Sequence, residues 1–234
     1  MARYQTLLSE TSFQRARDYL GSIQAGSQPG RFLQEKLAGH DLATLSVEAF
    51  LEQLVRTKKP QIFAESEVVG DGSDWNLTEL GLLADISMAV PVTFFDNGRH
   101  QHPDVHNPPF TGWLLFVPGA LLRNGRSHTP ADWPELVSNG QIDEAAYFQL
   151  YERRLLPGLL FINEQMRQQG RQALITVPGL GCGVFAGPFQ GQLGEKLKQA
   201  LHHLLSVHAP SLPHIRAVYY DPYRECQNER YELG

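Results

Sequence analysis

Short apolar runs alternate with amphipathic stretches from residue 60 onward, and this order limits the fold more than any other feature of the sequence. The strand-like runs lie at 60–69, 89–96, 112–122, 172–177 and 214–221, and helical spacing is found at 77–87, 143–169 and 191–209. Strands that alternate with helices favour a mostly parallel sheet with helices on both faces. We therefore expect an α/β fold with three layers, in which a mostly parallel or mixed sheet lies between helices.

The first 58 residues differ from the rest because they hold two helical patterns. Apolar residues recur at spacings of three and four over 10–23 and 46–59, and Ser46 is a suitable N-cap for the second stretch. We predict an N-terminal helical segment over 1–58 that packs on a core domain over 59–234. Pro157 falls inside the longest helical pattern, and we expect a kink there.

Composition argues against several classes of protein. The chain has 234 residues and a net charge of −5, and its Lys and Arg form no cluster that could neutralise nucleic-acid phosphates. No apolar stretch approaches the ~20 residues that cross a bilayer. The N-terminus lacks the apolar core of a signal peptide, and Cys182 and Cys226 form neither a metal-binding spacing nor a close pair. We expect a cytoplasmic protein that binds no nucleic acid and no membrane and needs no cofactor or metal.

Two glycine-rich loops follow strand-like runs, which is where α/β sheets bind their ligands. The first is GDGSDWN over 70–76, and the second is GLGCGVFAGP over 179–188. Glycine lets the backbone approach a ligand closely, and successive backbone N–H groups can bind an anion. The spacing fits neither a dinucleotide fingerprint nor a P-loop, so the pattern by itself leaves a phosphate cradle and a structural turn equally open.

The order of a strand, VPGLGCGVFAGP, an amphipathic helix and the strand IRAVYYD resembles the C-terminal part of a macrodomain, where this loop wraps the diphosphate of ADP-ribose. The segment GCGVFAG is most similar to the poly(ADP-ribose) glycohydrolase branch of microbial type, and IFAESEVVGDGSDWNLTELGLL is similar to the upstream signature of that branch. The resemblance covers about residues 60–222. It implies a macrodomain-like fold that binds ADP-ribose or an ADP-ribosylated protein and cleaves an ADP-ribosyl linkage.

The resemblance also implies which residues form the site. It places the diphosphate and the distal ribose against Gly179, Gly181, Cys182, Gly183, Val184 and Phe185. Gly70 and Gly72 fall in the glycine loop beside the ribose, with Asp71 in place of the middle glycine. Glu79 matches one acid of the family's Glu pair, and Leu80 stands in place of the second acid.

Hydrolysis at the anomeric carbon of ribose needs a carboxyl group that protonates the leaving group or activates water. The candidate catalytic residues are Glu79, Asp71 and Asp74, the acids nearest the first glycine loop. Each also has a structural interpretation, because Asn76 and Glu79 match a capping box and the two Asp residues are common in turns. A glycohydrolase that removes ADP-ribose from protein and a reader that binds ADP-ribose without cleaving it therefore both remain open.

A histidine-rich loop offers a third interpretation. His100, His102 and His106 could hold the metal of a hydrolase, but their spacing matches no metal signature, and polar loops rich in turn formers lie on the surface. Cys182 could act as a nucleophile at the start of a helix, but the sequence indicates no partner histidine for it. Trp75 could stack on adenine or ribose.

Overall fold

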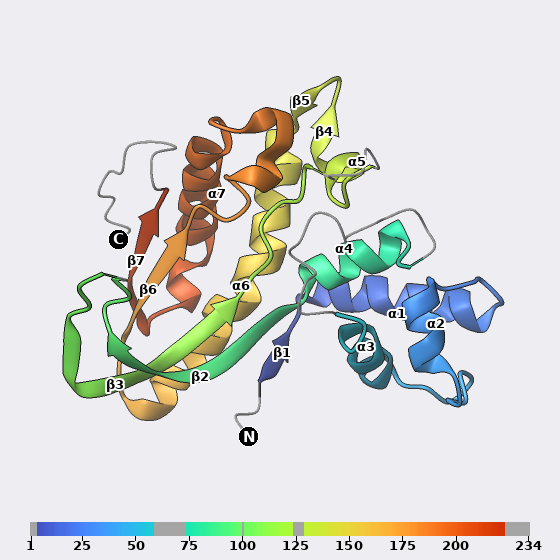
Figure 1. Cartoon of the computed structure of the whole chain (residues 1–234), viewed down its shortest axis with the longest axis horizontal. Helices are drawn as coiled ribbons and strands as arrows, with labels where there is room; N and C mark the ends of the chain where they lie inside the picture. The colour runs from blue at the N-terminus through green and yellow to red at the C-terminus, as the bar shows by residue number, and fades with distance from the viewer. Residues whose placement is uncertain (1–3, 59–73, 100, 124–128, 223–234) are drawn as a thin grey trace.

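The architecture is that of a computed structural model, which describes residues 4–58, 74–99, 101–123 and 129–222 (Figure 1). Its α-helices are α1 (Glu10–Gln24), α2 (Arg31–Leu37), α3 (Val47–Val55), α4 (Leu77–Asp85), α5 (Trp133–Leu136), α6 (Glu144–Gln169) and α7 (Leu193–His208). Its strands are β1 (Gln5–Leu7), β2 (Ser87–Asp96), β3 (Val105–Phe116), β4 (Val137–Ser138), β5 (Gln141–Ile142), β6 (Ala173–Pro178) and β7 (Ile215–Asp221). Two 3₁₀ helices, η1 (Val184–Phe189) and η2 (Ala209–Ser211), flank α7.

Side-chain caps begin the helices where the sequence places capping residues. The Ser46 hydroxyl accepts a hydrogen bond from the Ala49 N–H, as expected for the start of α3. At the start of α4, Asn76 and Glu79 form a complete capping box, in which each side chain accepts from the backbone N–H of the other. The expected helices over 10–23, 46–59, 77–87, 143–169 and 191–209 are thus confirmed in α1, α3, α4, α6 and α7, with small shifts at their ends.

The sheets differ from the expected arrangement, because antiparallel pairing dominates among the described strands. β1, β2 and β3 form an antiparallel sheet in that order, β4 and β5 form a short hairpin, and only β6 and β7 pair in parallel. The expectation of a mostly parallel sheet is therefore wrong for this part of the chain, while a mixture of parallel and antiparallel pairing is present. The predicted strand over 60–69 lies outside the described residues.

The length of the connection explains the antiparallel pairing of β2 and β3. β2 ends at Asp96 and β3 begins at Val105, and a parallel crossover needs about a dozen residues or more. The register runs from Met88 opposite Phe116 to Phe94 opposite Phe110. The histidine-rich segment therefore belongs partly to β3 and is not a loop throughout, contrary to our expectation.

Two apolar clusters organise the packing. The first joins α6, α7 and β6 to the segment that follows β3, and the second joins α1–α4. Figure 1 shows α6 and α7 side by side along the β6–β7 pair, with α1–α4 gathered on the opposite side of α6 from α7. Helix α6 contacts β1 and β2 as well as β6 and β7, so it packs against both the antiparallel sheet and the parallel pair.

Pro157 lies inside α6, which continues through it to Gln169. The predicted division of the chain after residue 58 stays a prediction. Contacts across that boundary include the pairing of β1 with β2 and the apolar cluster that α4 shares with α1–α3. No helix among the described residues is long and apolar enough to cross a bilayer.

Candidate functional site

The second glycine loop leaves the carboxyl end of β6 and leads into η1. Gly181 has a φ of +72°, in the region that favours glycine. The Cys182 side chain is 2% exposed and belongs to the apolar cluster of α6 and α7, whereas Gly183 is exposed and Val184 is 52% exposed. The loop therefore directs Cys182 into the core and presents residues 183–184 to solvent.

The same loop packs backbone against backbone on the segment that follows β3. A Cβ atom on Gly119 would overlap the backbone of Gly181, and a Cβ atom on Gly181 would lie 2.6 Å from the Ala120 nitrogen. The Leu122 N–H donates to the Phe185 carbonyl oxygen at 2.8 Å. Close packing of the two backbones is therefore sufficient to explain the glycines at 119 and 181, without any contact to a ligand.

Gly183 is different, because a Cβ atom there would meet no atom of the described residues within 4 Å. A Cβ atom on Gly179 would be in ordinary contact with Cys182, at 3.4 Å from its Cβ. Open space beside Gly183 therefore leaves room for a ligand against the loop.

Two side chains of α6, Tyr151 and Arg154, form hydrogen bonds to the backbone of these segments. The Tyr151 hydroxyl accepts a hydrogen bond from the Ala120 N–H at 3.1 Å and donates one to the Leu180 carbonyl oxygen at 2.5 Å. Burial raises the pKa of Tyr151, so its hydroxyl stays protonated at neutral pH and can donate. One hydroxyl therefore connects the two backbone segments.

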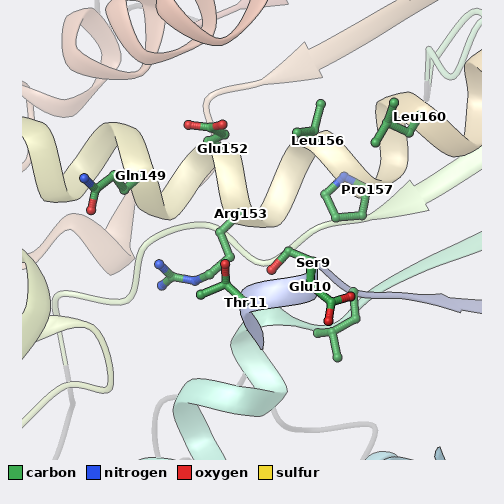
Figure 2. Close-up of a pocket in the computed structure, with 10 residues that line it drawn as sticks. Ser9, Glu10, Thr11, Gln149, Glu152, Arg153, Leu156, Pro157 and Leu160 are labelled. Atoms are coloured by element: carbon green, nitrogen blue, oxygen red, sulfur yellow. The ribbon is translucent and has the colours of Figure 1, made fainter. Parts of the chain in front are cut away.

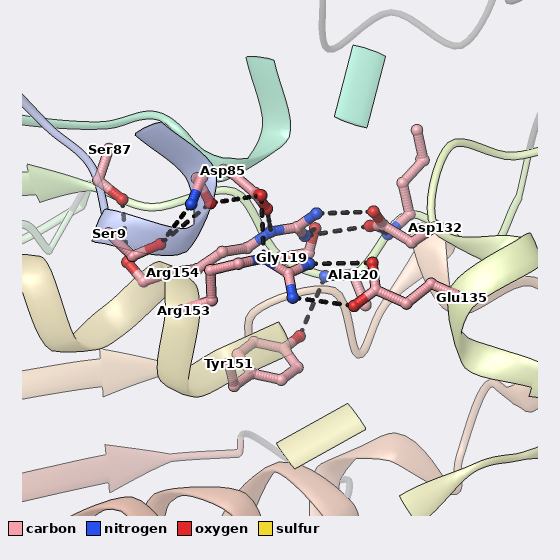
Figure 3. Close-up of polar contacts among 12 residues, drawn as sticks. Ser9, Asp85, Ser87, Gly119, Ala120, Asp132, Glu135, Tyr151, Arg153 and Arg154 are labelled. Atoms are coloured by element: carbon pink, nitrogen blue, oxygen red, sulfur yellow. Dashed lines mark hydrogen bonds and ion pairs between the residues drawn. The ribbon is translucent and has the colours of Figure 1, made fainter. Parts of the chain in front are cut away.

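One turn further along α6, the guanidinium of Arg154 is fully buried. It donates to both carboxylate oxygens of Asp132, at 2.6 and 3.0 Å, and to the Gly119 carbonyl oxygen at 3.0 Å (Figure 3). Burial by itself would lower the pKa of Arg154, but the charge and hydrogen bonds of Asp132 outweigh it and the pKa is raised. The charge of Arg154 is thus fixed, and it anchors the segment after β3.

Asp85, the last residue of α4, lies among three arginine side chains, one of which is Arg154. Its carboxylate accepts from Arg154 at 3.2 Å, Arg153 at 2.9 Å, Arg15 at 2.7 Å and Ser12 at 2.7 Å (Figure 3). Burial alone would raise the pKa of Asp85, but the three guanidinium groups and the Ser12 hydroxyl lower it overall. Asp85 therefore ties the N-terminal helices to the α6 residues that support the glycine loop.

The structure places Glu79 in the N-terminal helical cluster. Its side chain is fully buried, and its carboxylate accepts hydrogen bonds from the Tyr19 hydroxyl at 2.7 Å, the Gly30 N–H at 2.7 Å and the Asn76 N–H at 3.2 Å. A Cβ atom on Gly30 would overlap the Glu79 carboxylate. Glu79 thus joins α1, α2 and α4, and its described contacts are those of a structural residue.

The other predicted acids lie before α4. Asp74 forms an ion pair with Arg31, which donates through Nε at 3.0 Å and through a terminal nitrogen at 2.5 Å. Asp71, with Gly70 and Gly72, lies outside the described residues. Of the eleven predicted site residues, the structure brings together the six of the 179–185 loop.

A family model for the macrodomain effector MavL matches residues 4–234. The chain belongs to this macrodomain effector family. A search of curated proteins gave no match. Membership of the MavL macrodomain family points to ADP-ribose binding or hydrolysis, and it agrees with the macrodomain resemblance of the 177–188 segment.

The histidine-rich segment of this MavL-family chain shows no metal centre in its described part. His102 is exposed, and the His106 ring packs on Phe110 with a centroid distance of 4.9 Å. His100 lies outside the described residues, and no group of three potential metal ligands occurs among the residues that are described. Trp75 is a core residue, because it is 1% exposed and its indole N–H donates to the Thr57 hydroxyl at 2.9 Å.

A cavity of about 490 Å³ lies between the start of α1 and the middle of α6. Figure 2 shows its polar rim, which includes Glu10, Glu152 and Arg153, and its apolar side, which includes Leu156 and Leu160. None of the residues of the 179–185 loop lines this cavity. The cavity is therefore separate from the 179–185 loop.

Sequence reasoning missed the residues that support the loop, which are Gly119, Asp132, Tyr151 and Arg154. A signal was present for one of them, because Arg154 interrupts the apolar face of the helical pattern over 143–169. A charged residue on a buried helix face needs a partner, but the partner's identity could not be read from this spacing.

Proposed function

We propose that this MavL-family macrodomain binds ADP-ribose through the backbone of the 179–185 loop and hydrolyses an ADP-ribosyl linkage on a modified protein. The observation that carries the binding part is the geometry of the loop. Its glycines at 181 and 187 have positive φ and pack against the segment after β3, while Gly183 and Val184 face open solvent. A diphosphate lying beside Gly183 would meet backbone, with no side chain in the way at that position.

The finer likeness of GCGVFAG to the poly(ADP-ribose) glycohydrolase branch supports the hydrolytic part of the proposal. The proposed catalytic carboxyl groups are those of Glu79, Asp71 and Asp74. One of them would protonate the leaving group or activate water at the anomeric carbon. Gly70 and Gly72 are proposed to lie beside the distal ribose.

A second candidate is a reader that holds ADP-ribose without cleaving it. The environment of Glu79 favours this function, because a buried carboxylate that already accepts four hydrogen bonds is poorly placed to reach a ligand. The two functions share the 179–185 loop and differ only in the acids.

Val184→Glu tests the binding site. Val184 is 52% exposed, so a carboxylate there should leave the fold intact and repel a neighbouring diphosphate. A like-charge pair about 4 Å apart costs about 1 kcal/mol even in water, so we expect ADP-ribose to bind at least about fivefold more weakly by calorimetry. Val207→Glu is the matched control, since Val207 is 56% exposed on α7. Equal affinity of both variants and wild type would place the ligand elsewhere, and no binding by wild type at millimolar ADP-ribose would refute the proposal.

Release of ADP-ribose separates the enzyme from the reader. We would incubate the protein with substrates that carry ADP-ribose on different amino-acid side chains and measure the free ADP-ribose. An enzyme releases it, and Asp71→Asn, Asp74→Asn or Glu79→Gln abolishes release while binding persists. Binding without release from every linkage identifies a reader, and full activity of a variant removes that acid from the mechanism.

A further inference from the structure

Two segments far apart in the sequence meet beneath the proposed ADP-ribose site. One is the segment 119–122 after β3, and the other is the loop 179–182 after β6. Their backbones approach so closely that neither Gly119 nor Gly181 has room for a Cβ atom. The spacing of the two segments therefore determines where the exposed turn at 183–184 stands.

The Tyr151 hydroxyl connects these two segments through hydrogen bonds to both backbones. It accepts from the buried Ala120 N–H and donates to the half-buried Leu180 carbonyl oxygen, so one oxygen atom pairs with a backbone group on each side. The side chain is fully buried. A Cβ atom on Gly181 would lie 3.1 Å from this hydroxyl, which shows how closely the loop follows it.

A neighbouring tyrosine provides the contrast. Tyr147 lies one turn before Tyr151 on α6, is equally buried, and packs against it with ring centroids 4.9 Å apart. Among the described residues its hydroxyl makes no hydrogen bond. The two rings fill the same part of the core. The two tyrosines differ in that the Tyr151 hydroxyl forms hydrogen bonds to backbone groups of both segments.

We propose that Tyr151 is a positioning residue, whose hydroxyl holds the 119–122 and 179–182 segments at the spacing that shapes the ADP-ribose cradle. The effect on affinity rests on the proposed function of the 179–185 loop. Without the hydroxyl, the buried Ala120 N–H loses the acceptor that Tyr151 provides, and the Leu180 carbonyl oxygen keeps the weak Cys182 thiol donor at 3.6 Å. The two segments then gain by moving apart to reach water. A smaller fraction of molecules then has the binding-competent loop, and the apparent Kd rises in proportion.

The experiment compares Tyr151→Phe with two controls that also remove one buried hydroxyl. Tyr147→Phe deletes the unbonded hydroxyl from the same core. Thr57→Val deletes a hydroxyl that accepts from Trp75 and donates to the Leu54 carbonyl oxygen, in the other apolar cluster. Thr57→Val should therefore lower the melting temperature as Tyr151→Phe does, without touching the loop.

Two measurements are made on each variant. Hydrogen exchange of the Leu122 amide, in the protein without ligand, reports the contact of the two segments, because this amide donates to Phe185 and the substitution leaves both groups unchanged. Calorimetry gives the affinity for ADP-ribose. For Tyr151→Phe we expect faster exchange at Leu122 and about tenfold weaker binding, which corresponds to about 1.4 kcal/mol. Both controls should match wild type in exchange at Leu122 and in affinity.

The possible results are distinguishable. Wild-type exchange at Leu122 in Tyr151→Phe overturns the proposal, and so does a loss of affinity equal to that of Thr57→Val, since general destabilisation would then explain it. Faster exchange at Leu122 in a protein that binds no ADP-ribose would support the positioning of the two segments by Tyr151 and would refute the proposed function of the loop.

Discussion

Replacing Arg154 by methionine tests whether the buried ion cluster holds the site in place. Arg154 is fully buried and donates to Asp132 through two nitrogens, to Asp85 through Nε and to the Gly119 carbonyl oxygen. Methionine fills much of the same volume but pairs with none of these groups. The substitution therefore leaves buried acceptors behind without opening a large cavity.

The magnitude follows from what each acid retains. Asp85 keeps Arg15, Arg153 and the Ser12 hydroxyl, so most of the cost falls on Asp132. Asp132 keeps the Leu121 N–H at 2.8 Å. Removing one partner of a buried pair costs about 3–5 kcal/mol, and we expect the lower end because Asp85 stays paired. That loss is a large part of the ~5–15 kcal/mol that stabilises a typical domain.

Urea denaturation at pH 7, followed by circular dichroism, measures this difference. Arg167→Met is the matched control, since Arg167 lies on the same helix and pairs with the exposed Glu164, and we expect no measurable change from it. The double variant Arg154→Met/Asp132→Asn should regain part of the lost stability, because the stranded charge is then absent. A loss below about 1 kcal/mol in Arg154→Met would refute the reasoning, because the buried pair would then contribute no more than an exposed one.

The dependence of stability on pH tests the same cluster, because the direction of the change follows from the pKa shift of Asp85. The pKa of Asp85 is lowered in the fold, so its contribution to stability is present above its unfolded value of about 3.9 and is lost as the pH falls through the folded value. Wild-type stability should therefore fall steeply below about pH 4. The deficit of Arg154→Met should shrink over the same range, because the Asp85 carboxylate that Arg154 stabilises is then protonated in the wild type as well.

Two further predictions concern single positions. Gly181→Ala should strongly destabilise the fold, because Gly181 has positive φ and a Cβ atom would lie 2.6 Å from the Ala120 nitrogen. Gly21→Ala on the exposed face of α1 is the control and should stabilise the fold by about 0.5–1 kcal/mol. Thermal unfolding compares the two variants, and equal stability would contradict the close packing at Gly181. Burial, and to a smaller extent the charge of Arg154, lowers the pKa of Lys58 to about 8. The charged lysine therefore destabilises the fold at pH 7, and Lys58→Met should be more stable than wild type. Wild-type stability then rises between about pH 8 and the unfolded lysine value of about 10.4, so the advantage of the variant should shrink over that range, and an advantage unchanged between pH 7 and pH 10 would contradict this sign.

The sequence by itself determined the local structure of this protein. Apolar spacing placed α1, α3, α4, α6 and α7, and Ser46 and the Asn76–Glu79 box marked two helix starts, because helix periodicity and capping depend on residues within four positions of one another. The glycine loop was recognised in the same way, from one continuous segment.

Tertiary structure alone decided the partners. The antiparallel pairing of β2 with β3, the burial of Glu79 against Tyr19 and Gly30, and the meeting of Gly119 with Gly181 all join residues distant in the sequence. The buried Arg154 was visible in the sequence as an anomaly, but Asp132 and Asp85 became its partners only when α6 packed between the two apolar clusters. Such contacts depend on how whole elements pack, and no periodicity along the chain encodes which acid faces which base.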